Sequence, residues 1–207
     1  MAEDSIIIKH VKYCEESSFE VSSNKLGMWL FIVSDTVTFS VLLYGYGYLR
    51  NAASNWPTPF HFFPSIFNVV LMTFVLVTSS LTMSIAVSEA KALEKSAALK
   101  WISCTVILGL VFATLHIHEW FALAHEGMTL SHNPWGSPQF GAAFFSITGL
   151  HLLHVISGVV ALSVVALGYI RGRYTSADVE VWGLYWHFVE VAWMFIVPIV
   201  YLLNLQK

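Results

Sequence analysis

Long apolar segments dominate the chain, and short polar segments separate them. A helix needs about 20 apolar residues to cross roughly 30 Å of hydrocarbon. Five runs of this length are present, and they are too continuous for the alternating strands of a membrane barrel. They predict an all-α fold, an integral membrane bundle of five transmembrane helices. An N-terminal tail at 1–25 precedes the first helix. The predicted spans are about 26–49, 66–88, 101–124, 141–170 and 182–204.

The segments between the spans are of two kinds. WPTPFHFFP at 56–64 and SHNPWGSPQ at 131–139 are rich in helix breakers. SEAKALEKSAALK at 88–100 is charged and made of good helix formers. We therefore expect the helices on either side of 88–100 to extend into water. Pro198 is expected to kink the last helix, because it frees a carbonyl one turn earlier.

Basic residues indicate the orientation in the membrane. With five spans, eight of the ten Lys and Arg residues fall on the side that holds the N-terminal tail. The positive-inside rule therefore predicts a cytoplasmic N-terminus and an outside C-terminus. The eight are Lys9, Lys12, Lys25, Lys91, Lys95, Lys100, Arg171 and Arg173.

Composition supports a membrane protein and excludes several other classes. The chain is 57% hydrophobic and 11% charged, whereas a soluble domain is about 25% charged. No basic patch for nucleic acid is found. Cys14 and Cys104 form neither a CxxCH haem motif nor the close pair of a binuclear copper site.

Ionisable residues inside the predicted spans are the candidates for function. A charged side chain at the bilayer centre costs about 2.5–3.5 kcal/mol on the insertion scale. Such groups must therefore be neutral, paired, or facing water or another protein. The carboxylates are Asp35, Glu119 and Glu190, and the histidines are His116, His118, His151, His154 and His187.

Helical spacing groups most of these residues in pairs. His116 and Glu119, His151 and His154, and His187 and Glu190 are each three apart, so each pair shares a helix face. The span at 66–88 has no ionisable residue in its core but carries a run of hydroxyls at Thr78, Ser79 and Ser80. Three interpretations compete: a structural hydrogen-bond network, a proton path, and a His/Glu metal site. Spacing alone favours them in that order.

Aromatic residues near the predicted helix ends are typical of interfacial belts. We expect this placement for Trp29, Trp101, Trp120, Tyr185 and Trp186.

Four stretches, in order from about 26 to 203, resemble subunit III of the haem-copper terminal oxidases. They are GMWLFIVSDTVTF at 27–39, GLVFATLHIHEWFAL at 109–123, FFSITGLHLLHVISG at 144–158 and YWHFVEVAWMFIVPIVYL at 185–202. The chain is similar to the short, five-helix bacterial form of this subunit.

The resemblance implies an accessory subunit of a cytochrome c or quinol oxidase, which reduces dioxygen and pumps protons. Such a subunit carries no redox centre, catalytic residue or metal ligand of its own. Haems and copper belong to its partners, subunits I and II. It stabilises subunit I, supports proton uptake and holds structural phospholipid in the bacterial inner membrane, with a larger respiratory supercomplex as a possible assembly.

The resemblance also assigns positions to the intramembrane polar network. Asp35 takes the place of the carboxylate in the first motif, and Glu119 that of the glutamate in the next. His151, His154, His187 and Glu190 match the remaining polar positions. His116 and His118 depart from the family pattern, in which glutamine and tyrosine are frequent. Three alternatives stay open: an accessory protein of a nitric oxide reductase, a self-contained membrane metalloenzyme, and a stand-alone proton channel.

Overall fold

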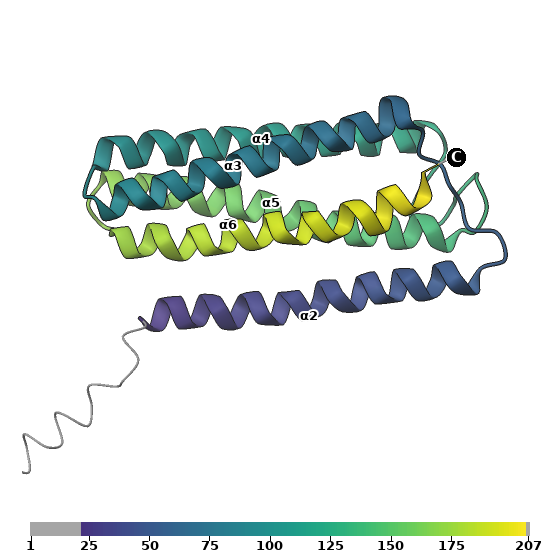
Figure 1. Cartoon of the computed structure of the whole chain (residues 1–207), viewed down its shortest axis with the longest axis horizontal. Coiled ribbons are helices and arrows are strands. Elements are labelled where there is room, and N and C mark those ends of the chain that lie inside the picture. The colour runs from purple at the N-terminus through teal and green to yellow at the C-terminus, as the bar shows by residue number, and fades with distance from the viewer. Residues whose placement is uncertain (1–21, 206–207) are drawn as a thin grey trace, which may run out of the picture.

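The computed structural model describes residues 22–205, so most of the predicted tail at 1–25 lies outside the described residues. Five long helices lie side by side with nearly parallel axes (Figure 1). The described residues form no strand, and Phe60 and Leu205 make one isolated bridge. The helices are α2 (Ser23–Ala52), α3 (Phe67–Lys91), α4 (Lys95–His125), α5 (Gln139–Ile170) and α6 (Ser176–Ile196).

Each helical segment is longer than its predicted span. A π-helical turn, η1 (Phe62–Ile66), leads into α3, while η2 (Val197–Tyr201) and the 3₁₀ turn η3 (Leu202–Asn204) extend α6. The resulting segments are 29 to 32 residues long, and all five are long and apolar enough to cross a membrane. At 1.5 Å per residue they measure about 45 Å, so their ends extend beyond the hydrocarbon layer.

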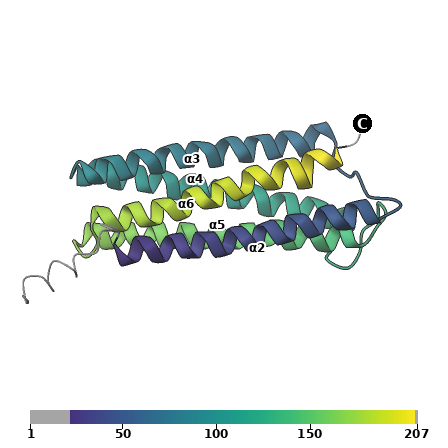
Figure 2. The same ribbon diagram turned by 60° about the horizontal axis from the view of Figure 1, so that its bottom comes forward.

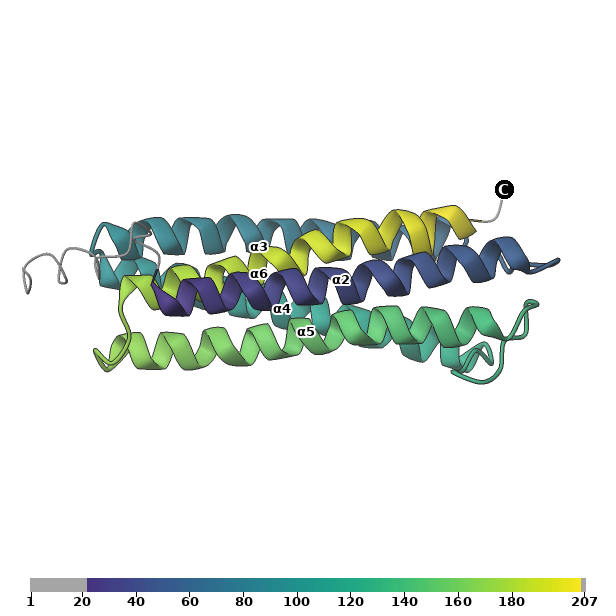
Figure 3. The same cartoon turned by 90° about the horizontal axis from the view of Figure 1, so that it is seen from below.

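Four helices form the body of the bundle, and α2 lies on its outside. α3 and α4 make a tight hairpin, while α6 packs against α3 and α5, and α5 packs against α4. Figure 1 shows α2 set apart from the other four, and Figure 3 shows it running along α6 and α5. Figure 2 shows the same five helices from an intermediate angle, with the two long connections at one end of the bundle.

α2 packs against the other helices along a narrow strip of its surface. It buries a stripe of Ile32, Phe39 and Tyr46, spaced seven residues apart. Other large side chains on this helix are open, among them Leu30 at 65% and Tyr44 at 79% exposed. Much of α2 therefore faces lipid or another protein.

Trp186 lies at the centre of the bundle, and the prediction of an interfacial position was wrong. Its side chain is fully buried, and its indole Nε1 donates to Ser79 Oγ at 3.0 Å. Its ring lies against Gly109 of α4 and Gly158 of α5, where a Cβ would come within 2.6 and 2.9 Å of the ring. Two glycines supply the space and one hydroxyl supplies the acceptor that the indole needs when buried.

Ion pairs tie the helices together at the end of the bundle where α2 and α6 begin. Glu180 of α6 contacts Lys25 of α2 at 2.7 Å and Lys91 of α3 at 3.0 Å. Lys95 donates to the carbonyl of Ile170 at 3.1 Å. Lys25, Lys91 and Lys95, three of the basic residues that indicate the orientation, thus lie at one end of the bundle.

At the opposite end, a buried amide joins the C-terminal turn to α2. Asn204 accepts a hydrogen bond from Trp56 Nε1 at 3.0 Å. Its Nδ2 donates to Tyr46 Oη and to the carbonyl of Val200. The helical path beyond Pro198 is therefore fixed by side-chain bonds as well as by packing.

Enlarging Gly158 is expected to destabilise the bundle. Gly158→Leu forces Trp186 out of its position, and overpacking of this kind costs about 1–3 kcal/mol. The measurement is the thermal unfolding midpoint in detergent. Gly45→Ala is the control, because nothing lies within 4 Å of its Cβ position. Equal unfolding midpoints in the two variants would contradict the central placement of Trp186.

Candidate functional site

The predicted polar network is divided into three clusters. Within residues 22–205, no three His, Cys, Asp or Glu side chains converge in a way that could hold a metal ion. Each cluster joins different helices. The first contains Asp35 and His154, the second His187 and Glu190, and the third His116, Glu119 and His151.

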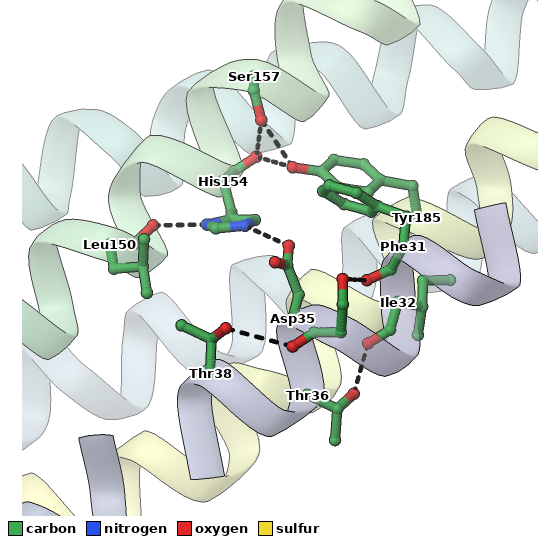
Figure 4. Close-up of polar contacts among 10 residues, drawn as sticks. Phe31, Ile32, Asp35, Thr36, Thr38, Leu150, His154, Ser157 and Tyr185 are labelled. Atoms are coloured by element: carbon green, nitrogen blue, oxygen red, sulfur yellow. Dashed lines mark hydrogen bonds and ion pairs between the residues drawn. The ribbon is translucent and has the colours of Figure 1, made fainter. Parts of the chain in front are cut away.

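The first cluster is a direct bond between α2 and α5 (Figure 4). His154 Nε2 lies 2.8 Å from Asp35 Oδ2, and His154 Nδ1 lies 2.8 Å from the carbonyl of Leu150. A carbonyl only accepts, so Nδ1 carries a proton. Nε2 then either donates as imidazolium to a carboxylate or accepts from a carboxylic acid. In both arrangements the pair shares one proton and has no net charge.

Few other groups stabilise the Asp35 side chain. The neighbouring hydroxyls of Ser34 and Thr36 donate to carbonyls of their own helix, at 2.8 and 2.7 Å. The ring of His154 meets Phe39 edge-on, with centroids 5.4 Å apart. Tyr185 donates to the carbonyl of His154 at 3.1 Å. His154 is therefore the side chain on which Asp35 depends.

The Asp35–His154 pair lies about halfway along the length of the bundle and is partly exposed at its surface. Both residues are near the midpoints of their helices. The side chains of His154 and Asp35 are 15% and 20% exposed. In a membrane this exposed edge meets either lipid or another protein.

The second cluster joins α6 to α3 through hydroxyls. His187 Nδ1 lies 2.7 Å from Ser80 Oγ, and Nε2 lies 3.3 Å from Ser84 Oγ. Glu190 Oε2 is 3.9 Å from His187 Nδ1, beyond hydrogen-bond length. The hydroxyl run noted at 78–80 thus supplies a partner for the histidine, whereas the helical spacing had suggested the glutamate.

The third cluster is buried among aromatic rings between α4, α5 and the end of α6. His116 and His151 are fully buried, with their rings stacked 6.4 Å apart. Trp193 lies 5.0 Å from the ring of His151. His151 Nε2 lies 3.1 Å from the carbonyl of Val189 and therefore donates to it. Glu119 Oε2 accepts from Tyr201 Oη at 3.1 Å.

Unpartnered polar atoms are concentrated in this third cluster. Among the described residues, the fully buried side-chain N and O atoms without a hydrogen-bond partner are His116 Nδ1 and Nε2, His151 Nδ1, Glu119 Oε1 and Trp120 Nε1. His116 therefore does not pair with Glu119, although the two are three residues apart. His118 points outward and is exposed.

Sequence reasoning did not identify Tyr185, Tyr201 and Ser84 as polar partners. Each contacts one of the predicted residues through a hydroxyl. Hydroxyl-bearing residues are common in apolar spans, so their type alone gives no signal. Their roles depend on which helices are neighbours.

Removing one member of the Asp35–His154 pair is expected to cost more than removing both. His154→Leu leaves Asp35 without a partner and is expected to lower the free energy of unfolding by about 2–3 kcal/mol. The double variant Asp35→Leu/His154→Leu is expected to recover most of that loss. The free energy of unfolding is measured by denaturation in mixed detergent micelles for the wild type, the two single variants and the double variant.

Ser34 provides the matched control for this double-mutant cycle. It is adjacent to Asp35 but bonds to its own helix, so Ser34→Leu and His154→Leu should be additive. Additive effects for Asp35 and His154 as well would show that the pair does not form.

Comparison with known proteins identifies the family. The family described as cytochrome c oxidase subunit III matches residues 6–204. Cytochrome c oxidase subunit 3 of Bacillus subtilis (strain 168) is 32% identical over 195 residues, covering 92% of this chain and 91% of the relative. Quinol oxidase subunit 3 of the same organism is 33% identical over 186 residues, covering 88% of each. The chain therefore belongs to the cytochrome c oxidase subunit III family, as its four motifs predict.

Proposed function

We propose that this chain is the accessory, non-redox subunit of a respiratory haem-copper oxidase that reduces dioxygen and pumps protons. The family match supports membership of an oxidase complex, and the five apolar helices support a multi-pass membrane protein. We assign haems and copper to the partner subunits I and II. In this proposal the chain stabilises subunit I and supports its proton uptake in the bacterial inner membrane.

The partly open Asp35–His154 pair is the observation that carries the proposal. Hydrocarbon offers no hydrogen-bond donors or acceptors, so polar groups at half depth normally face protein or water. The exposed edge of this pair lies on the face formed by α2 and α5. We therefore place the contact with subunit I on this face.

The shared proton gives this contact a chemical role. Since the pair has one proton between two side chains, that proton can move from one side chain to the other without changing the net charge of the pair. Passing it to the neighbouring subunit requires the pair to take up another proton in the same step, because the pair without its proton carries one negative charge. This property suits a subunit that supports proton uptake by its neighbour. It requires no metal or haem in this chain.

A groove beside the pair suits a structural phospholipid. Gly27 and Phe31 of α2, Ser157 and Ala161 of α5, and Trp182 of α6 line a pocket of about 400 Å³. The groove lies between the pair and the basic end of the bundle. We propose that an acyl chain fills it, with the phosphate near the lysines of that end, which we place on the cytoplasmic side.

Photocrosslinking of the assembled complex tests the proposed interface. A photoreactive residue at Leu153, which precedes His154 and is 65% exposed, is expected to crosslink to the haem-bearing partner. Phe74 of α3 is 69% exposed and gives the matched control, which is expected to crosslink to lipid alone. Mass spectrometry of the products identifies each partner. A partner crosslink from Phe74 and none from Leu153 would place the interface on the other side of the bundle.

A further inference from the structure

Glu190 carries a carboxyl group in the middle of the membrane, since it is the midpoint of the helical segment Ser176–Asn204. It lies 3.9 Å from His187 Nδ1 and makes no hydrogen bond to any residue within 22–205. Its side chain is 17% exposed, and neither of its oxygens is among the fully buried atoms without a partner. The carboxyl group is therefore unsatisfied within the described chain and can be reached from outside the bundle.

His187 does not supply the missing hydrogen bond, because serine hydroxyls occupy both of its ring nitrogens. Ser84 Oγ lies 3.1 Å from the carbonyl of Ser80 and 3.3 Å from His187 Nε2. The carbonyl only accepts, so Ser84 donates to it, and the oxygen of Ser84 accepts from Nε2. His187 Nδ1 faces Ser80 Oγ at 2.7 Å. Glu190 therefore needs a partner that the described residues do not provide.

Lipid head groups are too far from Glu190 to be that partner. The hydrocarbon layer is about 30 Å thick, so its midplane lies about 15 Å from the head groups on either side. Acyl chains carry no hydrogen-bond donors, and ionisable groups at this depth normally face protein or water. We therefore expect the partner of Glu190 on a transmembrane helix.

An open seam surrounds Glu190 where α3 and α6 pack together. Val77 and Ser84 are seven residues apart on one face of α3, and Val77 is 42% exposed. Met194 lies one turn after Glu190 and is 49% exposed. Figures 2 and 3 both show α6 running between α3 and α2. A partner helix can lie along this α3–α6 seam, which consists of Val77, Ser84, His187, Glu190 and Met194.

The charges of the chain argue against a second copy as the occupant of the α3–α6 seam. The five predicted spans contain no Lys or Arg, so a second copy has no positively charged side chain at this depth for Glu190. Two copies facing each other along the seam would instead bring two carboxyl groups together, which is costly. The missing group is a hydrogen-bond donor or a cation of a different protein.

We propose that the α3–α6 seam binds a transmembrane helix of another subunit, and that a side chain of this helix donates a hydrogen bond to Glu190 at mid-depth. This contact is separate from the one placed on α2 and α5, so the chain contacts partner helices on two sides. The inference rests on the proposed membership of a complex of several subunits.

Photocrosslinking of the assembled complex tests the α3–α6 seam. A photoreactive residue at Met194 is expected to crosslink to a membrane-spanning segment of another subunit, which mass spectrometry identifies. Leu110 of α4 is 52% exposed and is the matched control, expected to crosslink to lipid alone. Crosslinks from Met194 to lipid alone, or to a second copy of the chain, overturn the proposal. The Leu153 crosslink tests the proposed function separately, so the two failures can be told apart.

Two substitutions of Glu190 connect the crosslink to its carboxyl group. Glu190→Leu removes the acceptor and is expected to weaken binding of the partner helix about tenfold, the ratio for loss of one good hydrogen bond. The yield of the Met194 crosslink measures this loss. A loss in Glu190→Leu but not in Glu190→Gln would indicate a neutral donor on the partner, and a loss in both variants a cation. Either result supports the proposal, whereas an unchanged yield in Glu190→Leu overturns it.

The thermal unfolding midpoint of the full chain in detergent separates this contact from a role in folding. Because Glu190 has no hydrogen-bond partner among the described residues, Glu190→Leu is expected to leave the midpoint no lower than that of the wild type. A lower midpoint would assign the carboxyl group to the packing of the chain itself and would overturn the proposal.

Discussion

Hydrogen bonds between polar side chains of different helices organise this membrane bundle. Asp35 and His154 join α2 to α5, and His187 joins α6 to Ser80 of α3. His151 reaches a backbone carbonyl of α6. Apolar contact between helices gains little over contact with lipid. These bonds therefore determine which helices become neighbours and at what depth.

The outermost helix depends on this requirement most strongly. α2 buries only a narrow stripe, so its position is set by the Asp35–His154 bond in the middle and by Lys25 and Asn204 at the two ends. The same helix presents much open surface. In the proposed complex, this open surface of α2 is available for contact with a partner subunit.

The sequence predicts the helices well because continuous apolar length is a direct requirement of the bilayer. It also identifies the ionisable residues, because each is costly in an apolar span. Their partners could not be predicted, since helix adjacency is a tertiary property. His151 and His154 are three residues apart, yet one contacts α6 and the other contacts α2. Trp186 is central because two distant glycines leave room for its ring, which local composition does not reveal.

A reduced-minus-oxidised optical spectrum of the material that co-purifies with the tagged chain tests whether the chain is an oxidase subunit. Strong haem bands are expected to remain with the chain through size exclusion, at positions that identify the oxidase and distinguish it from a nitric oxide reductase. An intact, monodisperse preparation without haem would contradict an oxidase subunit. It would favour a protein that acts alone in the membrane.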